Sequence, residues 1–152
     1  MADLKENTMK ITTAYMGEVE INPSQIIKFE NGLPGFEEEK DFIQLPLSEG
    51  SAYQVLQSVK TAGLAFIITS PYVIIADYSF ELDESVTQAL DIKSDNEVAL
   101  FVIVSLKDTL ENSTVNMKAP IVFNIQNQKA KQIILNEDYA IRHQLTAEKK
   151  EV

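Results

Sequence analysis

The chain has 152 residues, of which 45% are hydrophobic, a length and composition that indicate one globular domain and exclude a wholly disordered chain. Its 13 basic and 23 acidic residues give a formal net charge of −10, which repels phosphate and argues against direct nucleic-acid binding. Cysteine is absent, which excludes disulfides, thiolate metal sites and a cysteine nucleophile.

The first half of the sequence has the pattern of short β-strands separated by turns. Runs of β-branched and aromatic residues alternate with glycine, proline or asparagine. Two of these runs flank a small connector with Gly63, which predicts a hairpin. The predicted strands cover residues 10–14, 18–21, 26–29, 42–47, 53–59 and 64–69.

Four more strands are predicted in the second half. Residues 72–78 and 98–106 have centres that are apolar on both faces, as expected of buried strands. We interpret 98–106 as a central strand. Residues 121–125 and 131–135 form a late pair, with Asn127 near the turn between them.

One segment has helical rather than strand periodicity. Asp83 is an acceptable N-cap, and Val86, Ala89 and Leu90 fall on one helical face. We therefore predict a short helix over residues 84–90 that covers an open end of the β-structure.

The order of these elements predicts the fold class. Many short strands at turn-punctuated spacing indicate a mainly β protein, a compact antiparallel β-barrel-like single domain with one short helix. We place the domain at residues 9–145. Residues 1–8 and 146–152 lack apolar anchors, so we expect a flexible N-terminal extension and a flexible tail.

Residues 29–42, FENGLPGFEEEKDF, carry the strongest turn signals of the chain. We interpret Gly32, Pro34 and Gly35 as loop-shaping, because glycine accepts positive φ and proline fixes φ near the value of an initiating turn residue. Phe36 is also loop-shaping, and we expect it to pin the loop onto the core; an exposed contact residue for a partner is the alternative.

Acidic residues follow this loop directly. Glu37, Glu38 and Glu39 are consecutive, and Asp41 is close by. Such a run is ordinarily a solvated surface. Charges next to a restricted backbone lose less conformational freedom on binding, however, so we predict these four residues as contacts for a basic protein partner.

Residues 116–124 form a second motif. Pro120 cannot donate to a sheet ladder, so we expect it at a strand start or on an edge. Asn116 and Asn124 can bond backbone groups and shape the turn. An exposed edge here could also accept a partner segment, which makes Asn116 and Pro120 candidate partner-binding residues.

Catalytic signals are scarce. The sole histidine, His143, excludes mechanisms that need two histidines and zinc sites that need three. No GxSxG elbow or GxxxxGK phosphate loop is present. We expect no enzyme activity, no cofactor and no metal site.

Two alternatives of another class stay open, a hydrolase and a small-ligand barrel. A glycosidase would need two carboxylates about 5 to 9 Å apart, and a ligand barrel would need a hollow interior. The candidate carboxylates are Asp77, Asp83 and Glu84, and the candidate cavity residues are Phe66, Tyr78 and Phe101.

Membrane and export signals are also missing from the sequence. No apolar run reaches the roughly 18 residues that cross a bilayer. The first residues are polar and acidic, unlike a signal peptide. We expect a soluble, cytoplasmic protein without membrane contact.

The two motifs resemble those of the FliW family, the flagellar assembly factors of bacteria. GLPGFE after a short strand and NxxAP are specific together, although Met117 stands where the family usually carries leucine. The resemblance covers roughly residues 9–143. Further matches, in order, are MKI at 9–11, LQS at 56–58, AF at 65–66, Asn124, QIIL at 132–135, Tyr139 and Arg142.

This resemblance implies a function by partner exchange. FliW-like proteins bind flagellin in the cytoplasm and also bind CsrA, a basic RNA-binding protein that represses translation of flagellin. The resemblance thus implies a non-catalytic, monomeric protein that relieves this repression until flagellin displaces CsrA. A flagellin-specific chaperone without a role in RNA regulation is the alternative.

Overall fold

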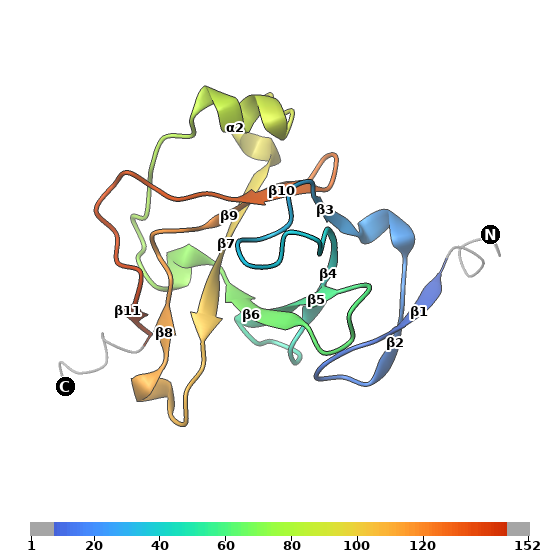
Figure 1. Ribbon diagram of the computed structural model, residues 1–152. Helices are drawn as coiled ribbons and strands as arrows, with labels where there is room; N and C mark the ends of the chain where they lie inside the picture. The colour runs from blue at the N-terminus through green and yellow to red at the C-terminus, as the bar shows by residue number, and fades with distance from the viewer. Residues whose placement is uncertain (1–7, 146–152) are drawn as a thin grey trace.

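The computed structural model describes residues 8–145 (Figure 1). Apart from Thr8, the predicted N-terminal extension and tail lie outside these residues. The strands are β1 (Met9–Thr12), β2 (Glu18–Ile21), β3 (Ile27–Phe29), β4 (Asp41–Pro46), β5 (Tyr53–Ser58), β6 (Ala65–Thr69), β7 (Val98–Ser105), β8 (Thr114–Val115), β9 (Ile121–Asn124), β10 (Lys129–Gln132) and β11 (His143–Gln144). The helices are the α-helix α2 (Glu84–Ala89) and the 3-10 helices η1 (Pro23–Gln25), η2 (Pro71–Val73), η3 (Asp95–Glu97) and η4 (Leu110–Asn112).

Seven strands close into a barrel, in the order β7, β6, β5, β4, β3, β10 and β9, with β9 pairing again with β7. Every pairing around the barrel is antiparallel except that of β3 with β10, which is parallel. The predicted antiparallel β-barrel with one short helix is confirmed for the described residues. Closure leaves the barrel with few free strand edges, which are the usual sites of unwanted pairing.

The barrel interior is filled by apolar side chains from all seven strands. Phe29 and Phe42 are fully buried there and meet edge to face, with ring centroids 5.3 Å apart. The interior void measures about 10 Å³, room for no more than about one water molecule. The interior is therefore a packed core and cannot admit a small ligand.

A second apolar cluster covers the outer face of β5, β6 and β7. Val55, Ile67 and Val102 point outward there and pack against Tyr78 and Met117. The buried Tyr78 hydroxyl donates a 2.7 Å hydrogen bond to the Met117 carbonyl, and burial raises the pKa of this phenol. The segments after β6 and β8 are thereby fixed to the outside of the barrel.

A small hairpin of β1 and β2 stands beside the barrel as a separate two-stranded sheet. Ile11 and Ile21 bury their side chains against Ile43 of β4. The Gln57 side chain also links this hairpin to the barrel, because its Oε1 accepts a 2.9 Å hydrogen bond from the Ala14 N–H.

Helix α2 lies across the end of the barrel where β7, β9 and β10 begin or end, as Figure 1 shows. Val86 and Leu90 pack on Val122 of β9. The predicted helix is confirmed, although Asp83 makes no side-chain cap hydrogen bond. Instead the buried Asn124 amide donates to the carbonyls of Leu90 (2.8 Å) and Asp91 (3.2 Å), which holds the C-terminal end of the helix.

The strand predicted at 72–78 is wrong. Pro71 begins the 3-10 helix η2, and the Ser70 hydroxyl caps it by accepting from the Tyr72 N–H at 3.2 Å. Proline at the first helical position lacks the N–H that a ladder requires. Ile74 and Ile75 are half-buried against the second cluster, so the apolar run reflects packing of a turn.

Other differences concern element ends and very short strands. The strand predicted at 131–135 lies at Lys129–Gln132, and Ile133 continues beside Pro120 through a 3.0 Å backbone hydrogen bond outside regular pairing. β8 and β11 were not predicted, because two residues carry no periodicity.

Candidate functional site

The GLPGFE segment is a tight turn that closes on itself. The Phe36 N–H donates to the Leu33 carbonyl at 2.7 Å, and the Leu33 N–H donates back at 3.4 Å. Pro34 and Gly35 occupy the two central positions, and Gly35 has φ of 85°. Proline followed by a residue with positive φ is the pattern of a type II turn.

Gly32 fixes the approach to this turn. Its φ is 68°, and its N–H donates to the Phe29 carbonyl at 2.9 Å. A Cβ atom at this position would lie 2.6 Å from the Glu37 Cα and 2.6 Å from the Phe36 carbonyl oxygen. The backbone of residues 36–37 thus folds directly over Gly32, and only glycine fits there.

The loop is anchored by one buried and one half-covered side chain. Leu33 is buried within the barrel core. Phe36 rests edge to face on Phe66, with centroids 5.5 Å apart, yet it remains 40% exposed. The expected core anchor is therefore an anchor at the rim, and the outer side of the Phe36 ring faces solvent.

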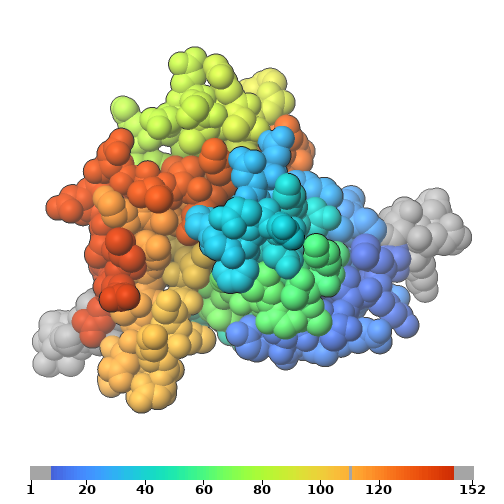
Figure 2. Space-filling model, in the orientation of Figure 1, coloured from blue at the N-terminus to red at the C-terminus, as the bar shows by residue number. Residues whose placement is uncertain are grey.

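The three glutamates differ in what they bond. Glu39 is held on both oxygens, since it accepts from the Ser58 and Thr61 hydroxyls at 2.7 Å each. These two hydrogen bonds hold the pKa of the Glu39 carboxyl below its usual range. Glu39 thus ties the loop to the connection between β5 and β6, and Figure 2 shows the two segments side by side (cyan and green).

The neighbouring carboxylates are more accessible. Glu37 and Glu38 are exposed, and Glu37 accepts a 3.1 Å hydrogen bond from the Gly35 N–H of the turn. Asp41 forms a 3.1 Å ion pair with Lys28, so its charge is partly compensated. Of the four predicted acidic contacts, Glu37 and Glu38 present the most available charge.

The second motif is built into the barrel. The Asn116 Oδ1 accepts from the N–H groups of Lys118 and Ala119, both at 3.1 Å, and so shapes the turn before β9. Pro120 is buried directly before β9. Within residues 8–145 the alternative of an exposed edge is not met, because β9 pairs with both β7 and β10. A partner contact by Asn116 or Pro120 stays a prediction.

One buried polar residue was not predicted as a site-forming residue. Gln57 is fully buried, and its Nε2 lies within 3.0 to 3.4 Å of the carbonyls of Ser58, Thr61, Ala62 and Leu64. Gln57 thus orders the connection between β5 and β6, to which Glu39 is hydrogen-bonded. The sequence signal for Gln57 was its position in the LQS match. The sequence of a strand alone does not show which polar side chain is buried.

The residues weighed for catalysis form no buried carboxylate pair within residues 8–145. Asp77, Asp83 and Glu84 are all exposed. Tyr78 and Phe101 line one surface groove, but Phe66 does not line it. Among residues 8–145, no group of three or more His, Asp or Glu side chains could hold a metal ion. His143 lies in β11 and its Nδ1 is 2.9 Å from the Gln144 carbonyl oxygen.

The fold and the loop define a small closed-barrel protein that presents an ordered acidic loop on its surface. None of the helices in the described range has the length and apolar composition of a membrane span.

Comparison with known proteins identifies the family. Residues 10–145 match the family model described as FliW protein. A flagellar assembly factor FliW of Bacillus pumilus (strain SAFR-032) is 46% identical over 138 residues, covering 90% of this chain and 96% of that relative. One of Bacillus subtilis (strain 168) is 44% identical over 141 residues, covering 92% and 99%. A crystal structure of the flagellar assembly factor FliW matches with a TM-score of 0.85 and 39% identity, covering 93% of this chain and 99% of that one.

The chain therefore belongs to the FliW family of flagellar assembly factors.

Proposed function

We propose that this protein acts as a non-catalytic, monomeric binding protein in the cytoplasm. It binds CsrA and relieves the repression of flagellin translation, and it binds flagellin, so that the two partners are exchanged. Family membership over residues 10–145 is the observation that carries this proposal. The net charge of −10 agrees with capture of a protein whose own surface must attract RNA phosphate.

The acidic loop is the proposed contact for CsrA. Glu37 and Glu38 are exposed beside a turn that is closed by backbone hydrogen bonds and anchored by Leu33. A pre-ordered loop loses little conformational entropy when it is bound. Glu39 acts indirectly, since its carboxylate holds the loop in place through Ser58 and Thr61.

Titration calorimetry with CsrA and flagellin from the same bacterium tests the proposal. Each should bind the purified protein, and flagellin should release CsrA from a preformed complex. In a gel-shift assay with flagellin message, the protein should weaken CsrA binding to RNA. Absence of heat with both partners would refute the proposed function.

A flagellin-specific chaperone is the second candidate. Its support is apolar surface on the C-terminal segment, where Ile134 is 76% exposed and Ile141 is 62% exposed. Such surface suits the apolar segments of an unassembled subunit. This candidate predicts flagellin binding together with an unchanged gel shift of CsrA on RNA.

A further inference from the structure

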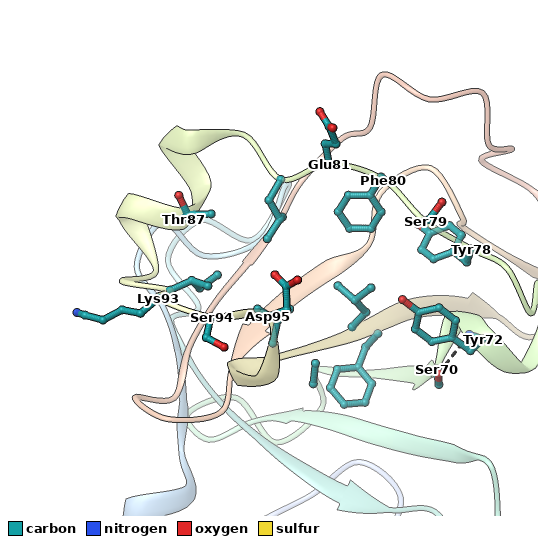
Figure 3. Close-up of a pocket in the computed structure, with 16 residues that line it drawn as sticks. Ser70, Tyr72, Tyr78, Ser79, Phe80, Glu81, Thr87, Lys93, Ser94 and Asp95 are labelled. Carbon is teal, nitrogen blue, oxygen red and sulfur yellow. Dashed lines mark hydrogen bonds between the residues drawn. The ribbon is translucent and has the colours of Figure 1, made fainter.

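A groove of about 1000 Å³ runs along the first half of β7 (Figure 3). In Figure 3 its upper wall is the segment from Tyr78 to Glu81, and Lys93, Ser94 and Asp95 close one end. Ser70 and Tyr72, at the start of η2, close the other end. This groove is separate from the acidic loop, none of whose residues line it.

The groove follows an edge of β7 that no strand of residues 8–145 covers. Residues Val98 to Phe101 pair with β9 on one side. On the other side, β6 pairs only with the residues from Val102 to Val104, because Pro71 turns the chain away after Thr69. Val98, Ala99, Leu100 and Phe101 all line the groove. Successive side chains of a strand point to opposite faces, so a groove lined by four in succession must run along the strand edge.

The backbone groups on this edge can be assigned from their neighbours. The Glu97 carbonyl accepts from the Ile125 N–H, and the Ile103 carbonyl accepts from the Asn116 N–H. The backbone N–H and carbonyl groups of the odd-numbered residues of β7 therefore point toward β9 and β8. The backbone N–H and carbonyl groups of the even-numbered residues point toward the open side. The Val98 N–H already donates a hydrogen bond to the Asp95 carbonyl. The Leu100 N–H and carbonyl and the Val98 carbonyl have no strand partner on this side within residues 8–145.

The walls and rim of the groove determine what would fit. Phe80, Leu82 and Ile92 are half-buried and give it apolar walls. Glu81 and Asp95 supply negative charge, whereas the charge of Lys93 is partly compensated by a 3.1 Å ion pair with Asp91. An occupant therefore needs apolar side chains facing the walls and basic residues at the rim.

We propose that the open edge of β7 binds an extended segment of a basic protein partner by strand addition. The segment pairs through backbone hydrogen bonds with Val98 and Leu100, places alternate apolar side chains against Phe80 and Leu82, and sets lysine or arginine near Glu81 and Asp95. This inference goes beyond the proposed function, since it holds whichever protein supplies the segment.

Amide hydrogen exchange measured by NMR on the full chain tests the edge directly. In the free protein the Leu100 amide exchanges quickly, whereas the Phe101 amide is protected by its pairing with β9. The probe is a short peptide of alternating valine and threonine with lysine at both ends. On its addition, exchange of the Leu100 amide slows about tenfold or more, as the new ladder bond forms.

Two control peptides separate strand addition from non-specific attraction. One carries proline at its centre, which removes ladder donors, and the other carries glutamate at both ends. Neither should protect Leu100. Equal protection by either peptide, or no protection by the lysine peptide, would overturn the proposal.

Matched variants test the same edge by affinity. Leu100→Pro removes the open-edge donor but no ladder donor, because the Leu100 N–H faces away from β9. Leu100→Ala removes the same side chain and keeps the N–H. We expect Leu100→Pro to bind the lysine peptide about tenfold more weakly than Leu100→Ala. Equal affinities would refute strand addition, and the exchange experiment decides the matter if Leu100→Pro does not fold.

Other occupants of the groove give different results. If Leu100 is already protected in the free chain and loses protection when residues 146–152 are removed, the chain's own tail fills the edge. If protection grows with protein concentration, a second copy fills it. Either result would overturn the assignment of this edge to a partner.

Discussion

Gly32 constrains the motif loop through two separate effects, a positive φ and close contact with the backbone of residues 36–37. Gly32→Ala should therefore lower the free energy of unfolding by about 2–4 kcal/mol, measured by urea denaturation. Gly35→Ala is the matched control, since Gly35 also has positive φ but leaves open space where a Cβ atom would lie. It should cost about 1–2 kcal/mol. Equal losses would contradict the steric role of Gly32.

Glu39 makes the stability of the loop depend on pH. Its pKa is lowered in the folded protein from an ordinary value of 4.5, chiefly by the hydrogen bond from Ser58 and then by that from Thr61. The stabilisation is therefore complete above pH 4.5 and is lost as pH falls through the lower folded-state pKa.

Glu39→Gln, which cannot titrate, tests this linkage. The difference in urea midpoint between the parent and Glu39→Gln should be largest at neutral pH and shrink in acid. Glu38→Gln is the control, because Glu38 is exposed in the loop. A pH-independent difference for Glu39→Gln would show that its carboxylate does not couple to folding.

For single residues, the sequence predicts local backbone conformation well, but it predicts hydrogen-bond partners from distant parts of the chain poorly. Glycine and proline at 32, 34 and 35 specify the turn because φ preferences act within a few residues. The roles of Glu39 and Gln57 depend on groups that the fold brings close. Ser58 is 19 positions from Glu39, and Ala14 is 43 positions from Gln57. No short-range pattern encodes such pairs.

Helix α2 is held at its C-terminal end by a buried polar side chain, Asn124. Asn124→Ala leaves the Asp91 carbonyl and the Gln126 N–H without their side-chain partner, and it removes one of the two side-chain amides that donate to the Leu90 carbonyl. We expect a loss of about 2–3 kcal/mol in the free energy of unfolding. Asn127→Ala is the control, because Asn127 is only half-buried; its amide donates to the Leu90 carbonyl and accepts from the exposed Lys129 N–H, and its loss should cost about 1 kcal/mol.

Urea denaturation gives these two costs, and amide exchange in α2 locates them. Exchange in residues 86–90 should quicken for Asn124→Ala more than for Asn127→Ala. If both variants behave alike, burial of Val86 and Leu90 is what holds the helix.

The prediction of strands and helices succeeded where the hydrophobic pattern extended over many residues. It failed where a proline changed the backbone course despite an apolar run. The 98–106 run gave β7, and the helical spacing after Asp83 gave α2. At 72–78 the apolar run suggested a strand, but the chain had already turned at Pro71. The parallel pairing of β3 with β10 could not be predicted, since strand register across distant segments leaves no local trace.

For the whole molecule, the distribution of charge governs the encounter with a basic partner. Under the proposed function, the double variant Glu37→Lys/Glu38→Lys should slow association with CsrA about tenfold at low salt. The effect should shrink as salt rises, because the screening length falls to about 8 Å at 0.15 M ionic strength. Stopped-flow measurements over a salt series give the rates.

The control for this variant keeps the same total charge. Glu18→Lys/Glu20→Lys reverses two exposed carboxylates on β2, outside the barrel. If both double variants slow association equally, net charge rather than the loop steers the partner.

The parallel contact between β3 and β10 also sets the order in which the molecule can form. It joins Lys28 to Lys129, so two residues about a hundred positions apart must meet before the ring is complete. On the ribosome, β3 cannot make this pairing until β10 has been synthesised. Such long-range closure favours slow folding and longer exposure of apolar surface on the nascent chain.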